Sequence, residues 1–289
     1  MLGAARPGFQ RITLGEFEVT ALLDGVTVFE QPQGVFGTDQ GVADVEAALS
    51  AAQLPTAAVE TGFTPTVVNT GNELVLFDTG NGAGGRPGRG QLIEQMAAAG
   101  YTPDMVDIVV ITHMHPDHIG GMMEDGAAAF PNARYVTGQV EYDFFSSDNL
   151  VGTPAERIYN LVQANVVPLA ENMSFIAPGD QVVSGIEAVN AFGHTPGHMA
   201  YHLESGGERL LITADTANHF VLSLQHPDWH VLFDADKEAA AATRRSLFGM
   251  AAADGVPFIG YHMPFPSMGY VEAAGDGFRY VPATYQLTL

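Results

Sequence analysis

Short apolar runs with strand or helix periodicity succeed one another along the chain. β-branched runs predict strands at residues 17–25, 66–70, 73–78, 107–111, 134–136, 187–192, 199–204, 209–213 and 257–261. Helical spacing predicts helices at residues 42–53, 91–99, 155–164 and about 236–253, with a short helical turn at residues 102–103. Because no linker or change in composition interrupts this alternation, we expect one α/β domain at residues 1–289, in which residues 1–35 add an N-terminal extension and the first strands.

Four side chains that can bind metal ions follow the apolar strand predicted at residues 107–111. The sequence there is His113-Met-His115-Pro-Asp117-His118. Residues two apart in an extended segment point to the same side, so His113 and His115 can share one ion. The proline cannot continue a central strand, so the chain turns and the last two side chains can face a second ion. A polar loop with exposed histidines is the alternative, which this specific spacing disfavours.

Three further predicted strands end in side chains of the same kind. His194 begins His-Thr-Pro-Gly-His after one strand, and Asp215 and His262 each end an apolar run. A single such residue is usually a capped turn or a satisfied core residue. Three of them at strand ends predict that the side chains converge on one rim of a sheet.

The composition limits the ligands and the partners. The 289-residue chain has no cysteine, so a metal site must use His, Asp and Glu. The formal net charge of −22, from 33 Asp and Glu against 11 Lys and Arg, disfavours nucleic acids, anionic membranes and highly anionic substrates as partners. No apolar run reaches the roughly 18 residues that span a bilayer. The first residues are not typical of a signal peptide, so we expect a cytoplasmic protein, or a periplasmic one if a signal peptide was trimmed.

The order of these residues resembles the metallo-β-lactamase superfamily. The resemblance rests on Asp78-Thr-Gly, the motif at residues 113–118, the His-Thr-Pro-Gly-His sequence, and the two isolated ligands Asp215 and His262. Within that superfamily the chain is similar to the methyl parathion hydrolase subgroup, which contains organophosphate hydrolases and related lactonases and arylesterases. The matching stretches are residues 14–22, 111–118, 129–133 and 277–282.

The resemblance implies a fold, a metal centre and a cofactor. The fold is a four-layer αβ/βα sandwich with two mixed β-sheets face to face and helices outside. Asp215 and a water or hydroxide would bridge two divalent ions, one held by His113, His115 and His194, the other by Asp117, His118 and His262. Zn²⁺ is the expected ion, and Mn²⁺, Fe²⁺ and Co²⁺ also suit these nitrogen and oxygen donors.

These features together predict a dinuclear metal-dependent hydrolase. We expect a metal-bridging hydroxide to attack neutral esters or lactones, with phosphotriesters as side substrates. Asp117 and Asp215 are the candidate proton carriers. A dedicated organophosphate phosphotriesterase is the alternative enzyme. The non-enzymatic alternative is a metal-binding module without catalysis, which the complete ligand set disfavours.

Other residues have predicted roles around the centre. Asp78 is expected to orient the motif loop by hydrogen bonds, and His198 to pack behind the ligands. An apolar substrate pocket is expected, with core packing as the alternative, at Phe144, Phe145, Phe265 and Met268. For three histidines the sequence leaves two alternatives, a place at the pocket mouth or an ordinary loop position: His219, His226 and His230. The aromatic residues of the same segment favour a homodimer if they are exposed.

Overall fold

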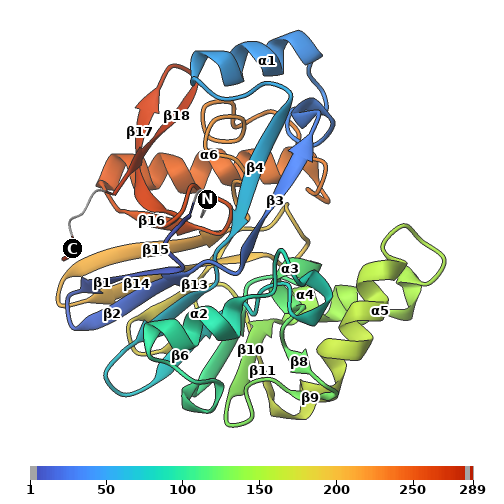
Figure 1. Cartoon of the computed structure of the whole chain (residues 1–289), viewed down its shortest axis with the longest axis vertical. Helices are drawn as coiled ribbons and strands as arrows, with labels where there is room; N and C mark the ends of the chain where they lie inside the picture. Colours follow the sequence, from blue (N-terminus) through green and yellow to red (C-terminus); the bar gives the residue numbers. More distant parts are fainter. Residues whose placement is uncertain (1–4, 284–286, 289) are drawn as a thin grey trace.

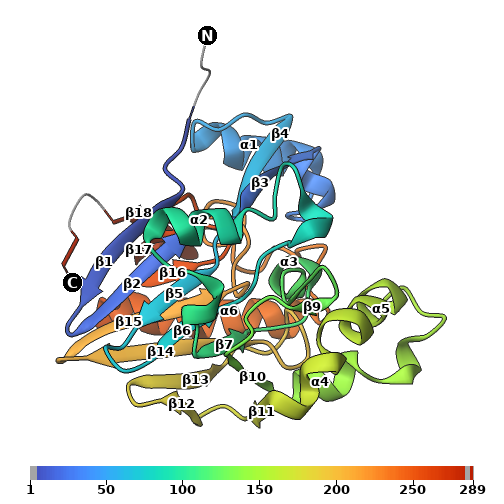
Figure 2. The same ribbon diagram turned by 60° about the horizontal axis from the view of Figure 1, so that its bottom comes forward.

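The computed structural model describes residues 5–283 and 287–288. Two seven-stranded mixed sheets lie face to face at its centre (Figures 1 and 2). The first has the order β1-β2-β5-β6-β7-β10-β11. Its strands are β1 (Phe9–Leu14), β2 (Phe17–Leu22), β5 (Thr66–Asn69), β6 (Leu74–Phe77), β7 (Ile108–Ile111), β10 (Arg134–Gly138) and β11 (Met173–Ile176).

The second sheet follows the chain order from β12 to β18. Its strands are β12 (Gln181–Val183), β13 (Ile186–Asn190), β14 (Met199–Ser205), β15 (Glu208–Ala214), β16 (Phe258–Gly260), β17 (Met268–Ala274) and β18 (Gly277–Pro282). Two separate hairpins pair β3 (Gly25–Glu30) with β4 (Ala58–Phe63) and β8 (Met123–Glu124) with β9 (Ala127–Ala128).

The described residues also form six α-helices and five 3₁₀ helices. They are α1 (Val42–Ala51), α2 (Leu92–Ala99), α3 (Pro116–Ile119), α4 (Gln139–Phe145), α5 (Glu156–Asn165) and α6 (Lys237–Asp254), with 3₁₀ helices at Pro32–Gly34, Ala83–Gly85, Pro103–Met105, Asp148–Leu150 and Val167–Asn172. α2 and α5 pack on the first sheet, and α6 packs on the second (Figure 1). The four-layer αβ/βα sandwich is therefore confirmed.

The short apolar runs of the sequence become strands that are buried on both faces. In β7, Ile108 and Val110 face the core between the sheets, whereas Val109 and Ile111 face the helices, and all four are buried. Continuous rather than alternating hydrophobicity is typical of a strand that pairs in parallel and is covered on both sides. The site therefore stands on a rigid base, because its loops emerge from such strands.

The N-terminal strands belong to the first sheet, since β2 pairs with β5. The following hairpin, β3–β4, packs with α1 in a smaller cluster of its own. In the part of the chain that the structure describes, no helix has the length and apolar character needed to cross a membrane.

Candidate metal centre

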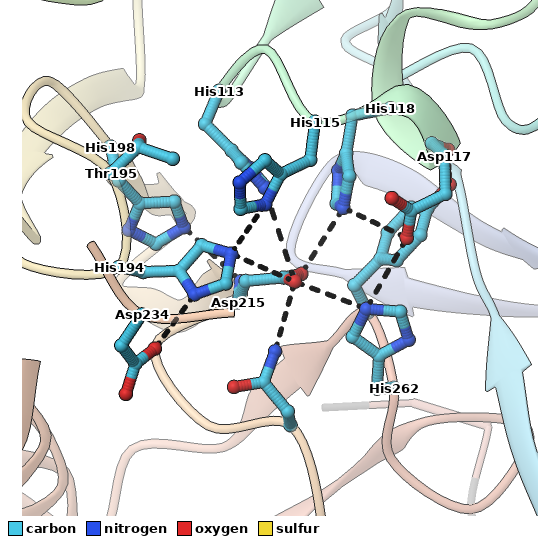
Figure 3. A network of polar contacts seen from close by, with 12 residues as sticks. His113, His115, Asp117, His118, His194, Thr195, His198, Asp215, Asp234 and His262 are labelled. Carbon is cyan, nitrogen blue, oxygen red and sulfur yellow. Dashed lines mark hydrogen bonds and ion pairs between the residues drawn. The ribbon is translucent and has the colours of Figure 1, made fainter. Parts of the chain in front are cut away.

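The loop after β7 carries four of the predicted ligands. His113 and His115 lie in the loop itself, and Pro116 begins α3, which carries Asp117 and His118. A proline is tolerated in the first turn of a helix because its missing N–H would have no partner there. The change from loop to helix directs the two pairs of side chains to different parts of the site (Figure 3).

The second sheet supplies three ligands from three strand ends. His194 lies in the turn between β13 and β14, Asp215 follows β15 directly, and His262 follows β16. β15 and β16 are parallel neighbours, so their carboxyl ends meet at one edge of the sheet. Ala214 adopts the left-handed conformation (φ +42°), which is rare for residues other than glycine and is often found at functional sites.

The donor atoms form two groups around Asp215 (Figure 3). The donor atoms of each group lie within 4.8 Å of one another. The first group consists of His113, His115, His194 and Asp215, and the second of Asp117, His118 and His262. Oδ1 of Asp215 lies 3.2 Å from Nε2 of His118, and its Oδ2 lies 3.1 Å from Nε2 of His262. The carboxylate of Asp215 therefore contacts residues of both groups.

Buried atoms without hydrogen-bond partners show that the residues fit metal ions. Among the described residues, Nε2 of His113, Nε2 of His118 and Oδ1 of Asp215 are buried and have no hydrogen-bond partner. Such atoms are rare in folded proteins because each loses its hydration without compensation. Here all three point toward the centre of the ligand set (Figure 3). Two divalent cations would satisfy them, and imidazole with carboxylate is a donor set that suits zinc.

Burial and neighbouring charges lower the pKa of some of these histidines and raise that of others. Burial and the nearby His194 lower the pKa of His115 to about 3, and burial with His118 lowers that of His113. A neutral imidazole is the form that binds a metal ion. For His118, burial opposes the charged form, but the surrounding carboxylates, Asp215 foremost, raise its pKa well above 6.5. A bound metal cation would balance the negative charge of the same carboxylates.

Asp78 makes the contacts that a supporting role requires. Its Oδ2 accepts a hydrogen bond from Nδ1 of His118 at 2.8 Å. The same carboxylate accepts from the backbone N and the hydroxyl of Thr112, both at 2.9 Å. His198 also lies behind the ligands, because its Nδ1 donates to Ala191 O at 2.8 Å and its Nε2 accepts from Asp215 N at 3.1 Å.

Three residues near the ligands were not predicted from the sequence. Asp234 accepts a hydrogen bond from Nδ1 of His194 at 2.8 Å. Tyr261 lies beside His118, with ring centroids 3.9 Å apart, and donates its hydroxyl to Asp117 O at 2.6 Å. Tyr261 directly precedes the predicted ligand His262 in the sequence, and this adjacency is the one local signal that could have indicated it.

Glu141 on α4, the third of these residues, connects the loops of the two sheets. Its carboxylate accepts from Met114 N at 2.8 Å, from the Thr195 hydroxyl at 2.8 Å and from Gly197 N at 2.9 Å. Burial raises the pKa of Glu141 to about 7, against the opposing effect of these hydrogen bonds. A side chain at Gly197 would approach Glu141 N to 2.3 Å, so the contact requires glycine.

A cavity of about 540 Å³ opens beside the second ligand group. His262 is part of its wall, and its apolar lining includes Leu23, Leu54, Val59, Phe220, Met263 and Phe265. Of the predicted pocket residues, Phe265 therefore lines the cavity. Phe145 is buried with its ring 6.3 Å from that of His115, Phe144 is 38% exposed on α4, and Met268 packs in the core between the sheets.

The three histidines for which the sequence left two alternatives have different environments. His219 lines the cavity, and its Nδ1 accepts from the backbone N of Val221 and Leu222, both at 3.1 Å. His226 stacks on Trp229, and His230 lies 3.4 Å from the Glu238 carboxylate.

A comparison with protein families identifies the chain. The family model described as the metallo-beta-lactamase superfamily matches residues 64–257, more than half of the chain. The chain belongs to the metallo-β-lactamase superfamily. The matched region of this superfamily member includes six of the seven predicted ligands, all but His262. The predicted family is thereby confirmed.

Relatives in this superfamily include lactonases. The structure of AidC, a dizinc quorum-quenching lactonase in complex with a product, is 27% identical, covers 96% of this chain and 98% of its own, and superposes with a TM-score of 0.88. The structure of the hydrolase AbOPH is 28% identical, covers 98% and 99%, and also has a TM-score of 0.88. An N-acyl homoserine lactonase of Bacillus cereus is 26% identical over 55% of this chain.

The sequence matches to curated relatives are partial. The match covers 62% of the length of the Bacillus cereus lactonase and 40% of that of an N-acyl homoserine lactonase from Bacillus sp. The similarity therefore extends over part of these proteins, whereas the similarity to the two solved structures extends over nearly the whole chain.

Proposed function

We propose that the protein is a dinuclear metal-dependent hydrolase of neutral lactones and esters with an apolar tail. The observation that carries this proposal is the convergence of seven metal-competent side chains beside an apolar cavity. The similarity to a dizinc lactonase over nearly the whole chain supports both the ions and the substrate class.

In this proposal His113, His115 and His194 hold one ion, and Asp117, His118 and His262 hold the other. Asp215 lies between the groups and contacts both. When bound, such ions supply Lewis acidity for a carbonyl or phosphoryl oxygen and lower the pKa of water to near neutrality. No side-chain nucleophile is needed, so the chain itself has to bind, orient and protonate the substrate.

Asp117 is the better placed of the two candidate proton carriers. Its side chain is 21% exposed, whereas that of Asp215 is 4% exposed. His118 and His262 hold the pKa of Asp117 at about 2 against the effect of burial, so its carboxylate is ionised before the reaction. Its Oδ2 can receive a proton and exchange it with solvent, which the enclosed Asp215 cannot do.

The cavity defines the apolar part of the substrate. Its apolar wall can bury an acyl or aryl group next to His262, at roughly 25 cal/mol per Å² of apolar surface. The net charge of −22 disfavours anionic substrates. A neutral carbonyl compound with an apolar tail satisfies both conditions. A neutral phosphotriester satisfies them too, so an organophosphate phosphotriesterase is the competing enzyme.

A hydrolysis assay with a pH indicator tests the proposal. Metal-loaded protein is given acyl-homoserine lactones of increasing chain length, an aryl ester and paraoxon. We expect kcat/KM for the lactones and the ester to exceed that for paraoxon. The reverse order would replace the proposal by the phosphotriesterase. A chain that binds the ions but hydrolyses none of these substrates would favour the metal-binding module without catalysis, and a chain that binds no ion after supplementation with zinc or manganese would refute the proposal.

A pair of phenylalanine variants locates the substrate tail. Phe265→Ala enlarges the cavity and removes apolar contact area, so we expect kcat/KM for long-chain lactones to fall about tenfold, with a smaller fall for short chains. Phe144→Ala is the matched control, because Phe144 is not part of the cavity wall. Equal losses for both variants or for all chain lengths would show that the tail binds elsewhere.

A further inference from the structure

A buried charged network extends from α6 to the ligand His194. We propose that Arg244 and Asp234 are positioning residues of the metal centre, which hold the Nε2 atom of His194 toward the ion shared with His113 and His115. This inference rests on the proposed dinuclear function and adds two residues that do not bind the ions themselves.

Asp234 determines which nitrogen of His194 is free. Its Oδ1 lies 2.8 Å from Nδ1 of His194, and both side chains are buried (Figure 3). An ionised carboxylate only accepts hydrogen bonds, so Nδ1 must carry the proton. The lone pair is then on Nε2, which lies 2.9 Å from Nδ1 of His115 and 3.3 Å from Oδ2 of Asp215. The contact thus selects the tautomer that can bind a metal ion.

Arg244 fixes Asp234 from the other side. One guanidinium nitrogen donates to Oδ2 of Asp234 at 2.8 Å, so both oxygens of this carboxylate are used. The Arg244 side chain is completely buried. A buried charge is unfavourable unless it is paired and hydrogen-bonded, and the network meets this condition.

The other donors of Arg244 bind the segment that begins after Asp215. Its Nε donates to Thr216 O at 3.0 Å, and a terminal nitrogen donates to Pro227 O at 2.7 Å and to Trp229 O at 3.3 Å. One guanidinium therefore contacts the neighbour of one proposed ligand and the carboxylate beneath another. The planar fork of arginine suits this set of acceptors, which lie in several directions.

Backbone contacts attach the segment directly before α6 to the His194 turn. Ala235 N donates to His194 O at 2.9 Å, and Asp236 N donates to Gly193 O at 3.0 Å. Gly193 has a φ of +128°, and a side chain there would approach Ala240 N to 2.3 Å. The turn and the start of α6 therefore form one unit, so a displaced Arg244 would displace the ligand as well.

The first test measures ion binding rather than turnover. Metal-free wild-type, Asp234→Asn and Arg244→Met proteins are titrated with Zn²⁺ in competition with a chelator, and with Co²⁺ followed by visible absorption. We expect affinity for one of two ions to fall about 10- to 100-fold in both variants. Affinity for the other should be unchanged, because Asp78 still supports His118. Arg244→Lys should lie between wild type and Arg244→Met, since it restores the charge without the fork.

The neighbouring arginine on the same helix, with its own acidic partner, provides the matched control. Arg245 pairs with Asp228, and both side chains are exposed (42% and 61%). Arg245→Met and Asp228→Asn should bind both ions as wild type does. A loss in Arg245→Met as large as that in Arg244→Met would overturn the inference, because any disturbance of the helix would then suffice.

The second test observes the His194 ring directly. Imidazole ¹⁵N chemical shifts of the metal-free protein should report a protonated Nδ1 in wild type and a mixture of tautomers in Asp234→Asn. This nearly isosteric variant decides the question even if Arg244→Met does not fold. Two ions bound equally by wild type and Asp234→Asn, with the same tautomer, would overturn this inference alone. A wild-type protein that binds no ion would overturn the proposed function as well.

Discussion

The two sheets contribute to the candidate centre in different ways. The first supplies four ligands from six consecutive positions after β7, supported by Asp78 from the neighbouring strand end. The second supplies three ligands from three strand ends, and the support of His194 comes from Asp234 and a buried arginine on α6. Both supporting carboxylates lie 2.8 Å from an Nδ1 atom. Both contacts join residues 40 positions apart, but only the carboxylate that supports His194 is itself held by a buried arginine on α6.

The two supporting carboxylates also differ in the direction of their pKa shifts. Burial raises the pKa of Asp78, against the effect of His118 and two hydrogen bonds from Thr112. The pKa of Asp234 is lowered despite burial, because it has Arg244 in addition to a histidine. The carboxylate of Asp234 is thus accompanied by the buried counter-charge of Arg244, whose removal leaves an uncompensated ion.

The largest expected effect is at the residue that both groups share. Asp215→Ala should lower kcat/KM by about a thousandfold or more, since loss of metal catalysis amounts to several kcal/mol and each 1.36 kcal/mol is tenfold. Ion content and hydrolysis are measured together. His115→Ala should lower activity similarly but spare the second ion. Full activity of metal-loaded Asp215→Ala would refute the proposed role.

The next effect is at Glu141, which joins the two halves. Glu141→Ala leaves two backbone N–H groups and a hydroxyl without a buried acceptor, so we expect a loss of about 3 kcal/mol in the free energy of unfolding. Urea unfolding of the metal-free protein measures it. Glu141→Gln keeps one acceptor oxygen and should lose less. Equal stability of both variants and wild type would show that the halves are held together without this contact.

Asp78→Asn tests the support of His118 in the same way that Asp234→Asn tests the support of His194. It should weaken the ion held with His118 by about 10- to 100-fold and leave the ion held with His194 unchanged. Competition titration of the metal-free variant separates the two. If both variants weakened the same ion, the two supports would not be independent and the comparison between the halves would fail.

The smallest expected effect is the contribution of His219 to the pH dependence of stability. Burial lowers the pKa of His219 to about 4, below the unfolded value of about 6.5. Its contribution to stability is therefore present above pH 6.5 and lost as the pH falls through 4, with a slope of at most about 1.4 kcal/mol per pH unit. Melting temperatures of wild type and His219→Asn between pH 7.5 and 5 should diverge, because asparagine can accept the same backbone hydrogen bonds without titrating. Parallel curves would contradict the assignment.

Local sequence patterns predicted the central strands and the order of the ligands. β7 and its motif are contiguous, and a strand buried on both faces needs a continuous apolar run, so both signals lie within a short window. Strands such as β3, β17 and β18 were not predicted as elements, because their partly exposed sequences lack that run. The order of motifs identified the superfamily, which the family comparison confirmed.

The buried strands, the superfamily and the order of the predicted ligands could thus be read without the structure. Tertiary structure alone decided the contacts of Asp234, Arg244 and Glu141, which join positions 10 to 56 residues apart and leave no periodic trace. It also decided the side of Met268, because the pairing of β17 with β16 turns this residue toward the core between the sheets. The physical reason is that burial and polar pairing depend on which elements meet, whereas periodicity depends only on neighbours along the chain.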